Sequence, residues 1–366
     1  MKQLINMRYS FFILLFFIAI IPNAFSQHAV FIEIADSNYS EVKRIIKSSD
    51  FNPNIVDEKG NSPLTLLSEA GELQLVKLLV KQGANINHKN NEQRSVVYQA
   101  TRKDQNKVVK YLVKNGADVN TPNSKGFTPI ITASSHGNVD LVKFLLKYGV
   151  NVNAQQIDGY TALHFVAEDV AEYSVEIVKA LVEHGINIEL KDKWGYTPLS
   201  RACKHDNYDV VKTLLEFNAN IESLNKWNLS PLTVAAQNGF INIVRLLVEN
   251  GANIESRDLW GYTPFHRAVL NSRSSLVSYF LNFEISIDLM SSDGQTALMM
   301  AVENRDHEIA EILLKGGSNS NKKKYSEKSL LSIALLNSDY VLADLLIKYK
   351  ADINESFVYL MTGGHT

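Results

Sequence analysis

The stretches Trp194-Gly195-Tyr196-Thr197-Pro198 and Trp260-Gly261-Tyr262-Thr263-Pro264 decide the fold of this 366-residue chain. The chain has three tryptophans, and Trp227 lies midway between the other two, 33 residues from each. A fixed period of about 20 to 50 residues is typical of a solenoid, in which each unit contacts only its neighbours. The sequence therefore predicts one elongated repeat domain, with the tryptophans at the same position in successive units.

Two more markers keep this register over most of the chain. A Thr or Ser recurs with the same spacing, except that the step from Thr161 to Thr197 is three residues longer and indicates an insertion. These positions are Ser62, Ser95, Thr128, Thr161, Thr197, Ser230, Thr263, Thr296 and Ser329. A Gly, or in one unit an Asn, begins a second recurring pair in most units, at Gly83-Ala84, Gly116-Ala117, Gly149-Val150, Gly185-Ile186, Asn218-Ala219, Gly251-Ala252 and Gly317-Ser318.

Each marker has a physical reason. A Thr or Ser hydroxyl caps the free N–H groups at a helix start, and Pro fits the first turn because it has no N–H to leave unpaired. Apolar residues at helical spacing, as in Val142, Leu145 and Leu146, predict a second helix. The Gly that follows accepts the left-handed conformation that ends a helix. Each unit is therefore predicted to contain two helices and an extended, turn-containing connection.

This pattern resembles the ankyrin repeat, whose signature is Thr-Pro-Leu-His-x-Ala. The signature is present in part in Thr161-Ala162-Leu163-His164, Thr263-Pro264-Phe265-His266-Arg267-Ala268 and Thr197-Pro198-Leu199-Ser200-Arg201-Ala202. The resemblance covers residues 57–354 as about nine units and implies an all-α solenoid of helix-turn-helix units with protruding β-hairpin loops. It also implies that His164 and His266 hydrogen-bond neighbouring backbone. Residues 27–56 are interpreted as a degenerate N-terminal capping repeat and residues 355–366 as a C-terminal tail.

The first 26 residues have the layout of a secretory signal peptide. Lys2 and Arg8 precede an apolar run over residues 11–21, which Pro22 and the small residues Ala24 and Ser26 follow. The run is shorter than the roughly 20 residues that span a bilayer. We expect cleavage before Gln27, no transmembrane span in the mature chain, and export to the periplasm, the cell surface or the medium.

Composition excludes several classes of function. A net charge of -2 gives no sign of the basic footprint of a nucleic-acid-binding protein. The single cysteine, Cys203, forms no internal disulfide and is expected to be partly buried. The histidines lack a metal-ligand spacing, and no glycine-rich loop has the context of a phosphate site. We predict a non-enzymatic, monomeric protein with no catalytic residues, metal ligands or cofactor.

Exposed positions of the repeat are therefore the candidates for binding. In the family that the chain resembles, hairpin tips and inter-helix turns contact partners. The corresponding tip residues are Phe127, Tyr160, Trp194, Tyr196, Trp227, Leu229, Leu259, Trp260 and Tyr262, and the turn residues are Lys204, His205, Gln237, Asn238, Leu270 and Asn271. Basic residues Arg94, Arg102 and Lys103, and Lys322 to Lys324, are interpreted as solubilising.

Two interpretations of the tryptophans remain open. They either stack between hairpins and stiffen the array, or form an interaction hot spot on the concave side. The hot-spot interpretation predicts that Trp227→Ala weakens partner binding by about 2 kcal/mol with little loss of stability. The insertion, which we place within Glu168-Asp169-Val170-Ala171-Glu172-Tyr173, is a second candidate, because insertions into repeats often lie on the binding face.

The sequence favours an exported scaffold that binds another protein through its hairpin tips and concave face, centred on residues 190–271. One alternative is binding of a glycan or other polymer, because regularly spaced aromatic rings can stack on sugars. Others are an inhibitory or auxiliary partner of an exported enzyme, and a host-contact factor. Fold alone does not select among these partners.

Overall fold

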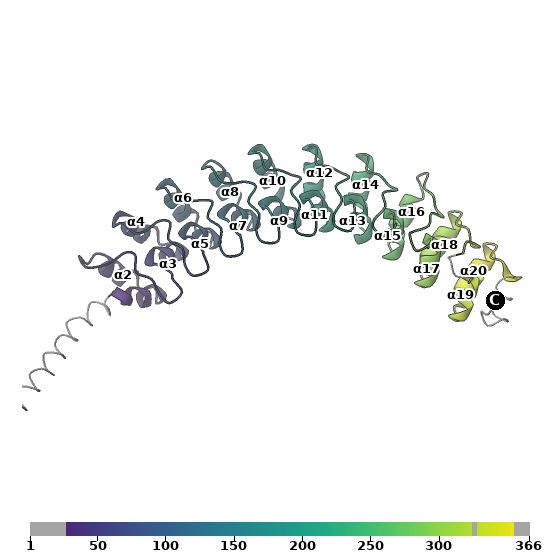
Figure 1. Cartoon of the computed structure of the whole chain (residues 1–366), viewed down its shortest axis with the longest axis horizontal. Coiled ribbons are helices and arrows are strands. Elements are labelled where there is room, and N and C mark those ends of the chain that lie inside the picture. The colour runs from purple at the N-terminus through teal and green to yellow at the C-terminus, as the bar shows by residue number, and fades with distance from the viewer. Residues whose placement is uncertain (1–26, 324–327, 355–366) are drawn as a thin grey trace, which may run out of the picture. The chain divides into compact units, whose positions relative to one another are not determined.

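The computed structural model describes residues 27–323 and 328–354, and regular secondary structure in these ranges is helical (Figure 1). The predicted signal peptide and the predicted tail lie outside the described residues. Between helix pairs, hairpin loops are closed by turns, and only one isolated antiparallel bridge, Lys89 with Ser95, is formed in the described part of the chain. The all-α solenoid predicted from the repeats is confirmed, with loops that are turns and not extended β-ladders.

The described part of the chain divides into two compact units, and the first contains residues 27–162 together with residues 183–186. Within unit 1, inner helices α3, α5 and α7 form one row and outer helices α4, α6 and α8 another (Figure 1). A helical segment over residues 27–35 precedes them. The helices are α2 (Tyr39–Ile46), α3 (Pro63–Ala70), α4 (Leu73–Lys81), α5 (Val96–Arg102), α6 (Asn106–Lys114), α7 (Pro129–Ser135) and α8 (Val139–Leu146).

Unit 2 contains residues 163–182 and the described residues from 187 onward. It repeats the same helix pair, with α13 packed against both α11 and α15. The helices are α9 (Ala162–Glu168), α10 (Ser174–Glu183), α11 (Pro198–Lys204), α12 (Tyr208–Glu216), α13 (Pro231–Asn238), α14 (Ile241–Glu249), α15 (Pro264–Leu270), α16 (Ser274–Phe280), α17 (Ala297–Glu303), α18 (His307–Lys315), α19 (Leu330–Leu336) and α20 (Tyr340–Lys348).

The recurring Thr or Ser caps the inner helix, as predicted. Its hydroxyl oxygen accepts a hydrogen bond from the backbone N–H three residues later, which satisfies one of the free donors of the first turn. This bond is formed by Ser62, Ser95, Thr197, Ser230, Thr263, Thr296 and Ser329. Thr128 forms no such bond, and its buried hydroxyl has no hydrogen-bond partner among the described residues.

The residue that follows most outer helices has a left-handed backbone, as predicted, whereas α16 is followed by Leu281 with a right-handed backbone. Gly83, Gly116 and Gly251 have φ angles of 84°, 87° and 86°. Asn218 and Lys350 take the same position with φ angles of 59° and 68°. Asn tolerates this conformation better than most residues, so the helix still ends there without glycine.

A ladder of side chains links successive loops within each unit. In unit 1, the Oδ1 atoms of Asn54, Asn87 and Asn120 each accept a hydrogen bond from the backbone N–H 31 residues later, at 2.7, 2.8 and 2.6 Å. In unit 2 the acceptors include carboxylates, with Glu189 and Glu222 bound at 2.7 Å to the next loop. These polar residues after each outer helix therefore hold neighbouring repeats in register.

Candidate functional site

The three tryptophans lie in hairpin turns of unit 2. In each turn, one side-chain oxygen accepts hydrogen bonds from two backbone N–H groups. Asp192 Oδ1 accepts from the backbone N–H groups of Trp194 and Tyr196 at 2.8 and 3.0 Å. Asp258 and Asn225 hold the other two turns in the same way. This is the Asx-turn geometry that Asp and Asn favour, and it gives each tryptophan the same backbone position.

The glycine after the tryptophan lets adjacent hairpins approach closely. Gly195 has a φ angle of 82°, and a Cβ atom there would lie 2.8 Å from the backbone nitrogen of Lys226. That nitrogen donates to the Trp194 carbonyl at 3.0 Å. Equivalent bonds join Leu259 to Trp227 and Ser292 to Trp260, at 3.2 and 3.0 Å. The hairpins are therefore held together by backbone hydrogen bonds as well as by ring contacts.

Two of the three tryptophans lie against an arginine from the inner helix. The Arg201 guanidinium is 5.1 Å from the ring centroid of Trp194 and 4.6 Å from that of Tyr196. Arg267 is 5.0 Å from the rings of both Trp260 and Tyr262. These distances are typical of cation–π contacts, so part of the aromatic surface serves to hold a charged side chain inside the unit.

Each of these arginines forms a buried ion pair with the aspartate that closes the hairpin. The Nε atoms of Arg201 and Arg267 both lie 2.7 Å from their partners, Asp192 Oδ2 and Asp258 Oδ2. The side chains of both aspartates are completely buried. Removing one member of such a pair costs about 3–5 kcal/mol, because it leaves a buried charge without compensation.

The middle hairpin lacks this arrangement. Asn225 stands where the other turns have aspartate, and Val234 stands where they have arginine. The Trp227 ring lies 6.1 Å from that of Tyr196, centroid to centroid. The Asp–Arg pairs were missed by the sequence analysis. Their signal is that both residues accompany Trp-Gly-Tyr in two units and are absent together from the unit between.

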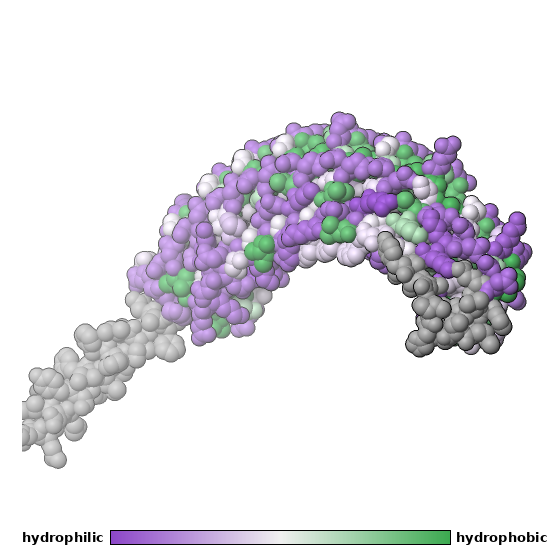
Figure 2. All heavy atoms as spheres, turned by 45° about the vertical axis from the view of Figure 1, so that its right-hand side comes forward, coloured by the Kyte–Doolittle hydropathy of each residue, from purple (hydrophilic) through white to green (hydrophobic). Residues whose placement is uncertain are grey.

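Exposure differs among the predicted tip residues. Leu259 and Trp260 are exposed by 55% and 47%, whereas Tyr160, Tyr196 and Leu229 are buried. The interpretation of these three residues as available tip contacts is wrong, because their rings and side chains face the scaffold. Phe127, Trp194, Trp227 and Tyr262 are half-buried. Figure 2 shows a face on which hydrophilic residues predominate, with hydrophobic residues between them. Leu259 and Trp260 form a pair of adjacent exposed apolar side chains, as do Tyr340 and Val341 on α20.

The predicted turn residues surround the hairpins with polar groups. Lys204 is exposed, and His205, Gln237, Asn238, Leu270 and Asn271 are half-buried. The Lys204 Nζ lies 5.4 Å from the Tyr196 ring centroid. Burial lowers the pKa of His205, while the nearby Glu168 carboxylate, 3.5 Å from Nε2, opposes this shift. His205 therefore lies beside the same Glu168 carboxylate that pairs with Arg201.

The insertion residues are the last residue of α9, Glu168, and the loop that leads to α10, and hydrogen bonds join them to the next repeat. Glu168 Oε1 accepts from Arg201 Nη1 at 2.9 Å, and the Asp169 carbonyl accepts from Asn207 Nδ2 at 2.9 Å. Tyr173 donates to the Asp169 carboxylate, and this bond raises the pKa of Tyr173 to about 12. Val170 and Glu172 are exposed, and Ala171 is half-buried. The loop is therefore anchored, with its exposed part limited to its centre.

The signature histidines have the structural role that the resemblance implied. Nε2 of His164 lies 3.1 Å from the Tyr196 carbonyl, and Nε2 of His266 lies 3.0 Å from the Leu289 carbonyl. Burial lowers both pKa values, that of His266 to about 4. Cys203 is completely buried, which raises the pKa of its thiol. In the described ranges, no group of three or more His, Cys, Asp or Glu side chains has the geometry of a metal site.

Comparison with known proteins identifies the repeat. A family model described as ankyrin repeats (3 copies) matches residues 31–123, 130–225, 217–291 and 265–356, and one described as ankyrin repeats (many copies) matches residues 102–146. The solved ankyrin repeat domain of human ASB11 is 27% identical, with a TM-score of 0.54, covering 62% of this chain and 99% of that domain.

A curated relative matches over a short stretch only. Alpha-latroinsectotoxin-Lt1a from Latrodectus tredecimguttatus is 40% identical over 60 residues, which are 16% of this chain. The matched part spans 4% of the length of that relative. Over the described residues, none of the helices combines the length and the apolar character that a membrane crossing requires.

Proposed function

Because the chain belongs to the ankyrin repeat family, whose repeats generally mediate protein–protein interaction, we propose that it is a non-enzymatic scaffold that binds a partner protein through unit 2. The surface consists of the exposed and half-buried residues of hairpin tips 193–195, 226–228 and 259–262 with the adjoining inner-helix turns. The observation that carries the proposal is the exposed pair Leu259 and Trp260. Large apolar side chains held at a fixed position are typical of interaction hot spots.

Rigidity supports this assignment. Arg267 contacts the Trp260 ring and is itself fixed by Asp258, so the ring is ordered before a partner arrives. A side chain that is already ordered loses little conformational entropy on binding. The exposed centre of the insertion loop, Val170 and Glu172, extends the surface within the same unit.

The glycan alternative is less well supported by this geometry. Stacking of a polymer on a row of rings needs several rings with open faces. Arg201 and Lys193 lie 5.1 and 4.4 Å from the Trp194 ring centroid, and Trp227 is half-buried. Trp260 is thus the most accessible of the three rings, which suits a local protein hot spot better than a repeated sugar site.

We also propose export, with residues 1–26 removed as a signal peptide and the mature chain acting outside the cytoplasm as a monomer. The support is the charged, apolar and small-residue order of that segment. N-terminal sequencing of the protein recovered from the cell envelope and from the medium tests this proposal. A mature terminus at Gln27 is expected, and an intact Met1 in both fractions would contradict it.

The binding proposal is tested by site-specific photo-crosslinking in the producing cells. A photoreactive residue at position 259 is expected to capture one defined protein, whereas the same residue at Tyr208, exposed on α12 of the same unit, is not. Trp260→Ala in the purified protein should weaken binding of the captured partner by about 2 kcal/mol, or roughly thirtyfold.

Two outcomes would contradict the binding proposal. Equal capture at positions 259 and 208 would mean that the hairpin surface is not special. Saturable quenching of tryptophan fluorescence by cell-wall glycan fragments, lost equally in Trp194→Ala, Trp227→Ala and Trp260→Ala, would favour the glycan alternative. Leu259→Ser serves as a second variant, since an exposed leucine contributes little to stability and its loss should still weaken partner binding.

A further inference from the structure

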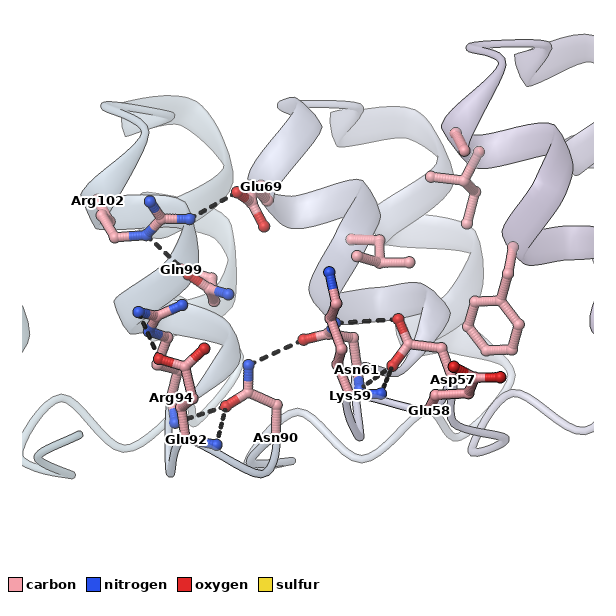
Figure 3. Close-up of a pocket in the computed structure, with 14 residues that line it drawn as sticks. Asp57, Glu58, Lys59, Asn61, Glu69, Asn90, Glu92, Arg94, Gln99 and Arg102 are labelled. Atoms are coloured by element: carbon pink, nitrogen blue, oxygen red, sulfur yellow. Dashed lines mark hydrogen bonds and ion pairs between the residues drawn. The ribbon is translucent and has the colours of Figure 1, made fainter. Parts of the chain in front are cut away.

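Unit 1 contains a hollow of about 560 Å³ between the hairpins, the inner helices α3 and α5, and the helical segment over residues 27–35. Figure 3 shows its lining, with polar side chains from two successive repeats facing the same space. Its volume is within the range of about 300–1,000 Å³ that is usual for ligand sites. It belongs to a different unit from the tryptophan surface.

The lining of the hollow is chemically divided. Phe31, Ile34 and Leu66 supply apolar surface. The charged lining consists of Lys59, Arg94 and Arg102 together with the carboxylates of Asp57, Glu58, Glu69 and Glu92. A negative ligand group is therefore accommodated only beside an arginine that the neighbouring carboxylates leave incompletely paired, with apolar groups of the ligand on the apolar surface. The sequence analysis interpreted both arginines only as solubilising residues.

Two carboxylates in the hollow already have partners. Asp57 Oδ1 accepts from the backbone N–H groups of Lys59 and Asn61 at 2.9 and 2.8 Å, so it closes its own turn. Glu69 Oε1 lies 2.6 Å from Arg102 Nη2, and Arg102 Nε donates to Gln99 at 2.9 Å (Figure 3). These bonds fix Arg102 as part of the wall.

Arg94 has a hydrogen-bond donor that no other side chain in the hollow uses. Its Nη2 lies 2.6 Å from Glu92, whose side chain is 59% exposed. Its Nε is buried and has no hydrogen-bond partner. A carboxylate normally takes the Nε and Nη2 atoms of one arginine edge together, but Glu92 uses only one of them. Exposed ion pairs are worth about 0–1 kcal/mol, so an incoming carboxylate displaces Glu92 at little cost.

A second hollow adjoins the first at the same arginine. Its volume is about 260 Å³, and it shares Glu92 and Arg94 with the first while adding Tyr98, Lys125 and Phe127. Arg94 therefore stands between two hollows that each contain aromatic side chains. A small acid fills one hollow, whereas an extended peptide spans both and places a central carboxylate at Arg94.

We propose that unit 1 binds an extended segment of a partner protein in which an Asp or Glu is flanked by apolar side chains. The carboxylate pairs with Arg94 in place of Glu92, and the flanking apolar groups enter the hollows beside Phe31 and Phe127. This site is independent of the tryptophan surface, so either can fail without the other.

The test is an NMR chemical-shift titration of the mature chain with blocked peptides. The probes are acetyl-Ser-Phe-Asp-Phe-Ser-amide, its Asn counterpart, and free 3-phenylpropionate. We expect the Asp peptide to shift signals of residues 92–99 and to bind at least tenfold more tightly than both other probes. Arg94→Gln should remove this preference, and Glu92→Gln should strengthen binding several-fold by removing the internal competitor.

Arg44→Gln is the matched control, because Arg44 also pairs with a nearby glutamate in unit 1 but lies outside both hollows. It should bind the Asp peptide as the unchanged protein does. Equal binding of the Asp and Asn peptides, or full binding by Arg94→Gln, would overturn the carboxylate site. Phenylpropionate binding as tightly as the peptide would overturn the assignment of a peptide and indicate a small acid.

Discussion

The hairpins of Trp194 and Trp260 share their sequence position with the hairpin of Trp227, yet their interiors differ. In the first two, a buried aspartate and an arginine form an ion pair against the aromatic rings. In the middle one, Asn225 closes the turn with a neutral side chain and Val234 fills the arginine position. The same backbone turn is therefore compatible with two different interiors, one ionic and one neutral.

This difference changes what the tryptophans do. Trp194 and Trp260 contact a guanidinium whose charge is balanced by aspartate, so they help to bury an ion pair. Trp227 contacts the Tyr196 ring of the preceding hairpin. Stacking between hairpins therefore describes Trp227, whereas the binding proposal concerns Trp260, which is the most exposed of the three.

The largest expected effect comes from removing Arg201, which strands the buried Asp192 carboxylate. Arg201→Ala should lower the local free energy of unfolding by about 3–5 kcal/mol, measured by hydrogen exchange of the α11 amides. The double change Asp192→Asn with Arg201→Val gives this hairpin the interior of the middle one and should recover most of that loss. A double variant as unstable as Arg201→Ala would show that the neutral interior does not transfer between units.

The repeat and its helix caps could be predicted from the sequence because they depend on local chemistry. A hydroxyl that caps a helix, or a glycine with positive φ, acts within a few residues. The roles of Ser62 and Gly83 can therefore be predicted from the neighbouring sequence alone. Burial of Tyr196 and Leu229 could not be predicted this way, because it depends on neighbouring hairpins. The pairing of Arg201 with Asp192 and Glu168 likewise depends on which side chains the fold brings together.

A second contrast between the repeats of Trp227 and Trp260 is a buried histidine that only the Trp260 repeat contains. His266 occupies the position that Thr233 has in the middle unit, and burial lowers its pKa from 6.5 to about 4. The unfolded chain then binds more protons than the folded one between these values. The contribution of neutral His266 to the free energy of unfolding is therefore fully present above about pH 6.5. It is lost as the pH falls towards 4, by about 3 kcal/mol in total.

Urea unfolding of the protein and of His266→Thr at a series of pH values measures this contribution. The variant lacks the hydrogen bond to Leu289, so it should be less stable at pH 7, and the difference should shrink as the pH falls. Other titrating groups, including His164, are present in both proteins and cancel in the comparison. A difference that stays constant between pH 7 and 4 would contradict the prediction.

The smallest expected effects concern the left-handed residue after each tryptophan. Gly195→Ala forces a Cβ atom into a backbone with φ of 82° and towards the Lys226 nitrogen, so it should cost about 1–3 kcal/mol. Asn228 already takes this position at φ 55°, so Asn228→Gly should change stability by less than about 1 kcal/mol. Hydrogen exchange of the amides of residues 226 and 259, which join adjacent hairpins, reports both effects. Equal losses in the two variants would mean that the close approach at Gly195 carries no special constraint, and that the ionic and neutral hairpins differ in their interiors alone.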